Sequence, residues 1–260
     1  MSHNPTTYLT SGFNKPEGTT LGIGLTCPSP EFAQICGNSG FDVVLIDMEH
    51  GPISIESAYR MVTALTGTAA EAWIRVAAND PTLIKLALDT GAHHIVVPMV
   101  NTKEEVEAAV AAAKYPPQGI RGYGPFRTQY QWNTNMLDYG SRANAETKVS
   151  VLIEHPRAIE NLDEILNVEG LGGAIAVPLD LAVNMGHTDG PNHQDVREAL
   201  AAASKKIAAK GFPIGSFAVT PAQGVAALKA GCQLLFLGFD VMFVPAAVQL
   251  YLAQLQNSAS

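Results

Sequence analysis

Short apolar runs recur along the chain at fairly even spacing, and a helical pattern follows each of them. Most of these runs are continuously apolar, which is typical of parallel strands buried on both faces. They predict eight strands, over residues 21–26, 42–47, 72–76, 94–98, 149–153, 173–177, 214–217 and 234–238. The amphipathic stretches between them predict helices over residues 30–36, 54–65, 81–88, 102–113, 156–166, 194–209, 221–229 and 241–254.

Eight strand–helix alternations in about 250 residues predict a (β/α)₈ TIM barrel. The rival is a doubly wound open sheet, because periodicity cannot prove that a sheet closes. No glycine-rich dinucleotide-binding turn follows the first strand, which favours the barrel. We expect an N-terminal tail over residues 1–18 and a single barrel domain over residues 19–257. The polar segment 119–148 is the longest irregular connection, and its length makes it a candidate functional loop.

Composition narrows the class of protein. The chain has 260 residues, 47% of them apolar, and a net charge of −8, with no basic run longer than Lys205-Lys206. This argues against a nucleic-acid partner. No apolar stretch reaches the ~18 residues of a membrane span, and the N-terminus has no secretory signal. The three cysteines fit no zinc pattern, and their sparse, odd count favours reduced thiols. We therefore expect a cytoplasmic protein without a membrane partner.

Two carboxylates, Glu154 and Asp180, end neighbouring predicted strands. Active sites of TIM barrels lie at this end of the strands. Adjacent strands are about 4.8 Å apart, so the two side chains can share one cation whose octahedron is completed by water or substrate oxygens. Taken singly, Glu154 could be a helix N-terminal acid and Asp180 an N-cap. Together they favour a metal site.

Other polar residues close or follow the strands. His50 has Asp47 three residues before it, and a histidine oriented by a carboxylate is a common general base. The alternative is a capped loop histidine. Arg75 ends an apolar strand with no anion nearby in sequence, so it requires an oxygen ligand or an ion pair at the barrel rim. Asp89 lies late in a helix, where an acid opposes the helix dipole and so suggests a role beyond stability.

The sequence does not support catalysis by a Schiff-base lysine or by an activated serine, nor a phosphate-binding loop. Every lysine belongs to a tail, a helix surface or a loop, so a Schiff-base aldolase is not expected. No G-x-S-x-G nucleophile elbow and no P-loop occur.

Read in order, these strand ends resemble the HpcH/HpaI family of metal-dependent 2-oxo acid aldolases, over residues 19–257. The resemblance rests on ordered segments, at residues 40–50, 75–81, 88–92, 97–100, 115–124, 153–154, 158–165 and 178–186. It implies a class II aldolase that cleaves a 4-hydroxy-2-oxo acid reversibly to pyruvate, or a related 2-oxo acid, and an aldehyde through a metal-stabilised enolate. Alternatives are a metal-dependent oxaloacetate decarboxylase or enolate-transfer enzyme on the same site, and a non-catalytic 2-oxo acid binding protein.

The resemblance also implies roles for individual residues. Glu154 and Asp180 would hold a divalent ion (Mg²⁺, Mn²⁺ or Co²⁺), Arg75 would bind the keto oxygen, and His50 would act as acid and base. The acid at Asp89 would raise the basicity of that histidine.

Substrate contacts follow in the same way. The backbone of Leu179 and Asp180 would hold the substrate carboxylate. Leu152 stands where the family commonly has a substrate-contacting glutamine, and Val177 and His155 are further departures.

Family members form hexamers, built as paired trimers that exchange C-terminal helices. Residues 241–255 agree with this pattern, since they have a broad apolar face and almost no charge. We expect a homo-oligomer, a trimer or a hexamer. The alternative is an eighth barrel helix that packs on its own sheet.

Overall fold

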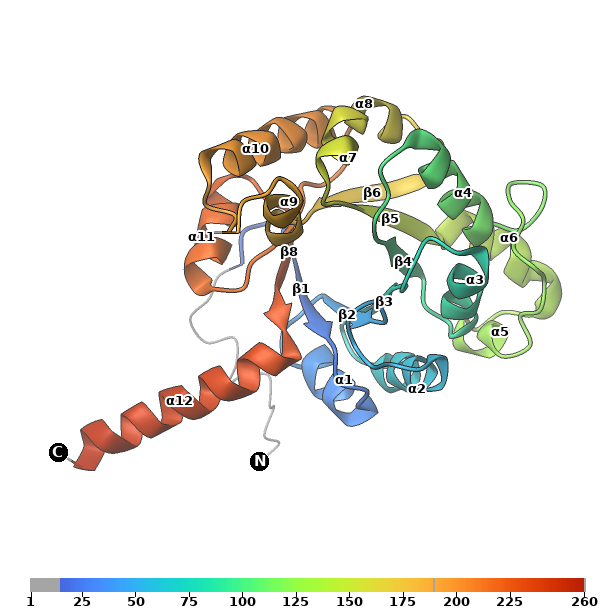
Figure 1. The fold of residues 1–260 in the computed structure, drawn as a ribbon. Helices are drawn as coiled ribbons and strands as arrows, with labels where there is room; N and C mark the ends of the chain where they lie inside the picture. The colour runs from blue at the N-terminus through green and yellow to red at the C-terminus, as the bar shows by residue number, and fades with distance from the viewer. Residues whose placement is uncertain (1–14, 189, 260) are drawn as a thin grey trace.

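The computed structural model describes residues 15–188 and 190–259. In this part of the chain, eight parallel strands pair in sequence order and β8 closes onto β1. Figure 1 shows the ring of strands with helices around it, so the predicted TIM barrel is confirmed. The strands are β1 Thr20–Leu25, β2 Val43–Asp47, β3 Glu71–Arg75, β4 His94–Val97, β5 Lys148–Ile153, β6 Leu171–Ala176, β7 Gly215–Phe217 and β8 Leu234–Phe239. The predicted tail lies largely outside the described residues.

The helices follow the strands, with three differences from the sequence-based expectation. They are α1 Pro30–Gly37, α2 Ile55–Leu65, α3 Pro81–Asp89, α4 Lys103–Ala113, α5 Thr128–Gln131, α6 Met136–Glu146, α7 Pro156–Glu160, α8 Leu162–Ile165, α9 Pro178–Asn184, α10 Gln194–Ala209, α11 Pro221–Lys229 and α12 Asp240–Ala259. An extra short helix, α9, follows β6. The helix predicted over residues 156–166 is broken at Asn161 (φ −89°, ψ 7°), whose side-chain amide donates to the carbonyl of Asn101.

The third difference is the segment 119–148, which is a structured insertion. It contains α5 and α6, and Trp132, Tyr139 and Ala143 form a small core there with Tyr115. The indole N–H of Trp132 donates to the carbonyl of Gly91, 2.9 Å away, just before β4 begins. The two helices are therefore anchored near the amino ends of the strands, and the expectation that this segment is an irregular connection is wrong for this part of it.

Local sequence signals explain where the helices begin. Asp80 accepts hydrogen bonds from the first-turn backbone N–H groups of α3, and Pro81 follows it. Thr102 and Glu105 form a capping box on α4, and Thr220 and Gln223 form another on α11.

Two apolar layers stabilise the barrel. The larger one packs the outward faces of the strands against the surrounding helices. The second fills the barrel interior with Val43, Leu45, Trp73, Val96, Leu152, Ile175, Val177, Leu234 and Phe236. Because all strands are parallel, their carboxyl ends form one rim, and this interior layer is the floor beneath it.

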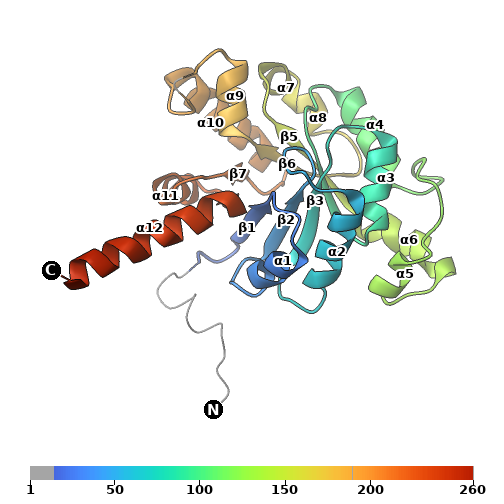
Figure 2. The same ribbon diagram turned by 60° about the horizontal axis from the view of Figure 1, so that its bottom comes forward.

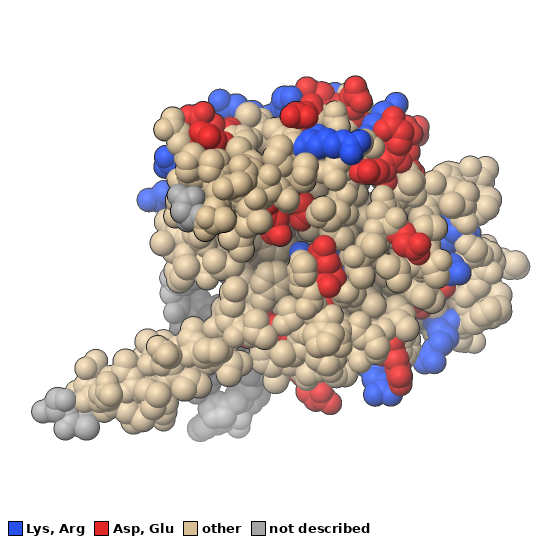
Figure 3. All heavy atoms as spheres, viewed as in Figure 1, with Lys and Arg blue, Asp and Glu red and all other residues tan. Residues whose placement is uncertain are grey.

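The C-terminal helix α12 departs from the barrel and projects away from it (Figures 1 and 2). Its side chains from Val241 to Asn257 are exposed, and Figure 3 shows no charged side chain along its visible length. The alternative of an eighth helix packed on its own sheet is therefore wrong. An apolar groove remains beside β1, β8 and α11, lined by Leu21, Ala218, Val225, Leu228, Leu235 and Leu237 among others.

Two further expectations concern membrane-spanning helices and the cysteine thiols. No helix within the described ranges combines the length and apolarity that a membrane span requires. Cys27, Cys36 and Cys232 are free, as expected from their number and spacing.

Candidate active site

Polar residues gather in a hollow at the carboxyl ends of the strands. Figure 3 shows acidic side chains at the centre of this face. A cavity of about 520 Å³ opens there, lined by His50, Arg75, Val177, Pro178, Leu179, Asp180, Pro191, Phe217, Val219, Gln223 and Phe239. Residues from β2, β3, β6, β7 and β8 thus meet in one place, although they are up to 189 positions apart in sequence.

Arg75 is held rigidly at the edge of this cavity. The pairing of β2 and β3 sets Asp47 opposite Arg75, and both residues end their strands. Arg75 Nε lies 2.8 Å from Asp47 Oδ1 and Arg75 Nη2 lies 2.6 Å from Asp47 Oδ2, a bidentate pair. Burial opposes the charge of Arg75, but Asp47, Glu49 and Glu154 outweigh it and raise its pKa. Asp47 is thus the nearby anion that sequence reading did not find.

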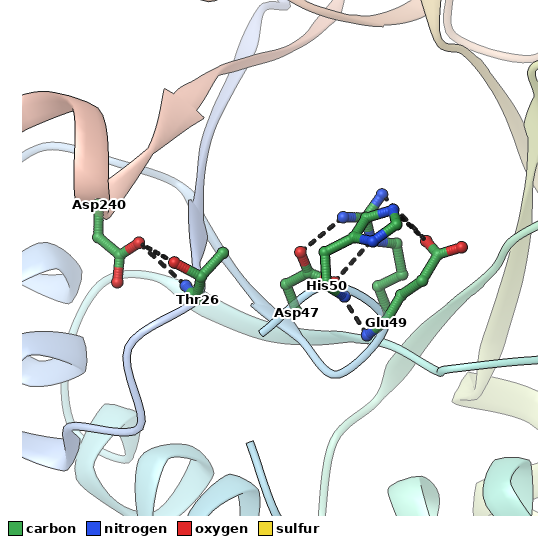
Figure 4. A network of polar contacts seen from close by, with 6 residues as sticks. Thr26, Asp47, Glu49, His50 and Asp240 are labelled. Atoms are coloured by element: carbon green, nitrogen blue, oxygen red, sulfur yellow. Dashed lines mark hydrogen bonds and ion pairs between the residues drawn. The ribbon is translucent and has the colours of Figure 1, made fainter. Parts of the chain in front are cut away.

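Glu49, and not Asp47, is the carboxylate beside the imidazole of His50 (Figure 4). Glu49 Oε2 lies 3.7 Å from His50 Nε2 and 3.2 Å from Arg75 Nη1. Asp47 meets His50 only through the backbone, accepting the N–H groups of Glu49 and His50 at 3.0 and 3.3 Å. The expectation that Asp47 orients the His50 ring is therefore corrected. Asp47 shapes the turn and holds Arg75.

Glu154 follows β5 and is buried at the same rim. Its Oε1 accepts the backbone N–H of Met99 at 2.5 Å, and Met99 has a positive φ of 55°. Its backbone carbonyl accepts the side-chain amide of Asn184, from α9, at 2.9 Å. Burial raises the pKa of the Glu154 carboxyl, the Met99 hydrogen bond lowers it, and the charges of Glu49 and Asp180 raise it further.

Asp180 lies in the first turn of α9 and lines the cavity. The N-cap of this helix is Val177, so the alternative that Asp180 is an N-cap is wrong. Asp180 faces the same region as Glu49 and Glu154, since its charge raises the pKa of both.

The donor set fits a hard divalent cation. Three carboxylates act on one another electrostatically here, and Glu49 Oε2 is buried without a hydrogen-bond partner. Burial is the largest cause that raises the pKa of Glu49. A bound cation would offset the repulsion among these nearby carboxylates. Carboxylate oxygens are also the ligands that Mg²⁺ and Mn²⁺ prefer.

A second cluster of side chains, separate from these carboxylates, has ligand atoms close enough together to hold a metal ion. Among the described residues, His187, His193 and Asp195 are the group of three whose ligand atoms all lie within 4.8 Å of one another. The two rings stack at 3.6 Å, and His193 Nδ1 already accepts the N–H of Asp195 at the start of α10. A cation there would oppose the positive end of the α10 dipole, so this group is a weaker candidate.

Two residues expected at the site lie elsewhere. Asp89 is at the end of α3, which runs back toward the amino ends of the strands, and its carboxylate pairs with Arg121 at 2.7 Å. Within one chain it therefore has no contact by which to raise the basicity of His50. Leu152 is fully buried in the barrel interior and is not among the cavity-lining residues, so the structure gives no support for a substrate contact there. Leu179 is exposed and lines the cavity.

Several residues of the site were not singled out from the sequence. Glu49 sits between two residues that were singled out, and its position beside the strand end was the available signal. Phe217 and Phe239 end β7 and β8, so the rule that strand ends form the site applied to them also. They were missed because apolar strand ends resemble ordinary core.

Known proteins resemble this chain over almost its whole length. The model of the HpcH/HpaI aldolase/citrate lyase family matches residues 23–247. A 2-keto-3-deoxy-L-rhamnonate aldolase from Klebsiella pneumoniae is 34% identical, covering 93% of this chain and 91% of the relative. A 2-dehydro-3,6-dideoxy-6-sulfogluconate aldolase from Pseudomonas putida is 38% identical, covering 80% and 81%.

A solved structure agrees with these relatives. An HpcH/HpaI aldolase/citrate lyase family protein from Burkholderia cenocepacia superposes with a TM-score of 0.87 at 27% identity, covering 98% of this chain and 100% of that one. The resemblance inferred from the strand ends is thereby confirmed, and with it the expectation of an enzyme. The chain belongs to the HpcH/HpaI aldolase/citrate lyase family and is a carbon–carbon lyase.

Proposed function

We propose that the protein is a class II aldolase that reversibly cleaves a 4-hydroxy-2-oxo acid to pyruvate, or a related 2-oxo acid, and an aldehyde. One observation carries the proposal: a buried guanidinium, Arg75, held by Asp47 at a cavity whose rim has three interacting carboxylates. Cleavage breaks the C3–C4 bond, and its electron pair becomes the enolate of the 2-oxo acid. The oxidation state of the pair of products equals that of the substrate, so no redox partner is needed.

Glu154 and Asp180 are the residues that would hold a divalent ion (Mg²⁺, Mn²⁺ or Co²⁺). When bound, such an ion supplies a Lewis acid beside the keto group. Glu49, which faces both carboxylates, would hydrogen-bond to water there.

Arg75 would stabilise the charge that develops on the keto oxygen. Its pairing with Asp47 and Glu49 pre-organises the guanidinium before substrate arrives, so little reorganisation accompanies the reaction. This kind of preorganised donor is typically worth several kcal/mol of transition-state stabilisation.

His50 would transfer the proton. Its side chain is 66% exposed and lines the cavity, and Glu49 Oε2 is 3.7 Å from its ring nitrogen. During cleavage the imidazole would accept the proton of the C4 hydroxyl, directly or through one water, and later return a proton to C3 of the enolate.

The first turn of α9 would bind the substrate carboxylate. The first backbone N–H groups of a helix have no intrahelical acceptor, and those of Leu179 and Asp180 belong to this turn at the cavity wall. Pro178, which has no N–H to offer, begins the helix.

The proposal is tested by pyruvate release from 4-hydroxy-2-oxo acids, followed after chelation and after return of Mg²⁺ or Mn²⁺. We expect activity to disappear on chelation and return with metal, to be absent in Asp180→Asn, and to fall at least ~100-fold in Arg75→Lys, which keeps the charge but not the bidentate fork. Exposed Arg60→Lys on α2 is the matched control. Full activity in Asp180→Asn would reject the assigned site.

We also propose that the protein is a homo-oligomer in which α12 of a second copy fills the groove beside β1, β8 and α11. The exposed apolar side chains of α12 and the apolar groove are complementary in character, and each would be costly to leave in water. A trimer or hexamer is the expected assembly.

A further inference from the structure

Much of the wall of the cavity is apolar, and it limits what the reaction partner of pyruvate can be. Phe217, Phe239, Val219, Leu179 and Pro191 line it. Apart from His50, Arg75 and Asp180, the one side chain with a polar end among the lining residues is Gln223. The chemistry of the 2-oxo acid already engages the first three, so the rest of the substrate meets this wall.

Phe239 is held firmly in that wall. Its ring lies where β1 has no side chain, because a Cβ on Gly24 would come within 2.3 Å of Phe239 Cδ1. Phe217 lies nearly parallel to it, with ring centroids 6.1 Å apart and an interplanar angle of 7°. Phe217 also stacks on Phe236 at 4.8 Å, which continues the aromatic surface into the barrel interior.

This wall begins directly beside the reacting centre. The guanidinium carbon of Arg75 is 5.8 Å from the centroid of the Phe239 ring. A substrate whose keto oxygen binds Arg75 therefore has the aromatic rings within reach of the carbons that follow the keto group. Of these carbons, C3 stays with pyruvate, and C4 with the carbons beyond it leaves as the aldehyde.

Gln223 has few hydrogen-bonding atoms left with which to bind the hydroxyl groups of a substrate. Its Oε1 accepts the backbone N–H groups of Val219 and Thr220, at 3.0 and 3.2 Å, and so caps α11. Only its Nε2 remains, which is a donor and can meet a single acceptor oxygen. The several hydroxyl groups of a sugar-like aldehyde would find few partners here, and unpaired hydroxyls disfavour binding.

We propose that the physiological aldehyde is apolar, with an aryl or alkyl group that packs on Phe239 and Phe217. The inference rests on the proposed aldolase function, since it names the substrate class of the same site. In the synthetic direction the C3 proton of pyruvate leaves to the base, the new C–C bond forms at the aldehyde carbon, and its oxygen takes one proton.

The test compares two aldehydes of similar size with pyruvate as the common donor: benzaldehyde, and a hydroxylated aldehyde such as erythrose. We expect kcat/KM to favour benzaldehyde by ~10–100-fold, the range by which an apolar pocket discriminates against hydroxyl groups. Phe217→Tyr adds one hydroxyl to this wall, and it should lower this ratio by ~10-fold. Val183→Thr, on an exposed face of α9, should leave it unchanged.

Both aldehydes are measured on the same preparation, so any loss of folded protein cancels from the ratio. Solvent deuterium exchange into pyruvate, without aldehyde, separates this inference from the proposed function. Exchange together with equal or reversed preference would overturn the apolar acceptor and leave the aldolase intact. Absence of exchange would reject the aldolase, and the acceptor inference with it.

Discussion

At the level of single residues, the site depends on a buried ion pair. Asp47 is fully buried and Arg75 nearly so, and they make two short hydrogen bonds. Neither carboxylate oxygen of Asp47 is free to act on substrate, and Asp47 is not among the cavity-lining residues. We therefore describe it as a positioning residue for Arg75.

Asp47→Asn should destabilise the fold by about 3 kcal/mol or more, because it leaves a buried guanidinium without its charged partner. It should also lower kcat for pyruvate formation and leave the affinity for Mg²⁺ or Mn²⁺ unchanged. Urea unfolding and metal titration measure the two effects. The exposed pair Glu56–Arg60 has the same 2.6 Å separation, and Glu56→Gln should cost less than about 0.5 kcal/mol. Equal effects of the two substitutions would contradict this account.

Glu154→Gln tests the metal assignment with little risk to the fold. A glutamine oxygen still accepts the N–H of Met99, so the local backbone is preserved. Loss of the charge should weaken Mg²⁺ or Mn²⁺ binding by more than ~100-fold, above the usual effect of residues that only support metal ligands. Calorimetric titration measures this, with exposed Glu160→Gln on α7 as control. Unchanged metal affinity in Glu154→Gln would remove it from the ligand set.

The roles of individual residues were only partly accessible from the sequence. Glu154, Asp180, Arg75 and His50 were found because polar residues at strand ends are conspicuous in an apolar chain. The Asp47–Arg75 pairing was not, because it depends on strand register, and the location of Asp89 depends on the direction in which α3 runs.

At the level of elements, α12 is the helix whose exposed apolar side chains are not explained by contacts within one chain. Asp240, at its first turn, is buried and accepts hydrogen bonds from Thr26, as Figure 4 shows, and from the backbone N–H groups of Cys27 and Val241. The start of the helix is therefore tied to the end of β1. Met242, Phe243 and Ala246 still line the groove beside the barrel, and beyond them the helix leaves the barrel with its apolar side chains exposed. The sequence predicted the helix and its apolar face, but not the direction in which it leaves.

Charging the face of α12 should dissociate the assembly. Val248 and Leu252 lie one turn apart, and the double variant Val248→Lys, Leu252→Lys puts two ammonium groups where an apolar groove is expected. Light scattering should show a lower mass than that of the wild type. Ala253→Lys, on the opposite side of the helix, should keep the wild-type mass. A wild-type protein that is already monomeric would contradict the exchange.

At the level of the whole molecule, the barrel has a polar cluster at the end opposite the cavity. His94 begins β4, stacks on Trp73 with ring centroids 3.5 Å apart, and hydrogen-bonds through Nε2 with Ser150 Oγ at 2.7 Å. Burial, assisted by the charge of Lys148, lowers the pKa of His94 to about 3. The folded barrel therefore holds this ring neutral at pH values where an unfolded chain protonates it.

His94 therefore lowers the stability of the folded barrel at acidic pH. A base whose pKa is depressed on folding contributes stability above its ordinary pKa of 6.5, and that contribution is lost as pH falls toward about 3. His94→Gln should therefore show a weaker loss of unfolding free energy than the wild type between pH 6.5 and 3, although it is less stable at pH 7. Urea titrations across this range measure the difference. A parallel pH dependence in both proteins would refute the role of His94.

The sequence predicted the fold of the whole molecule well, because strand count and continuous apolar strands are properties of local pattern. The apolar cavity wall was not predicted, since it requires Phe217 and Phe239 to meet across the rim while Gly24 leaves space. The wall combines residues from three separate strands, so the pattern within any one strand does not reveal it.

The central claim is that this cavity makes an enolate from a 2-oxo acid. Its most direct test is the exchange of the pyruvate methyl protons in D₂O, followed by NMR on the purified protein with and without EDTA and added Mg²⁺ or Mn²⁺. This measurement needs no knowledge of the aldehyde. We predict metal-dependent loss of the methyl proton signal in the wild type and none in Asp180→Asn. Absence of exchange with every metal would contradict the account.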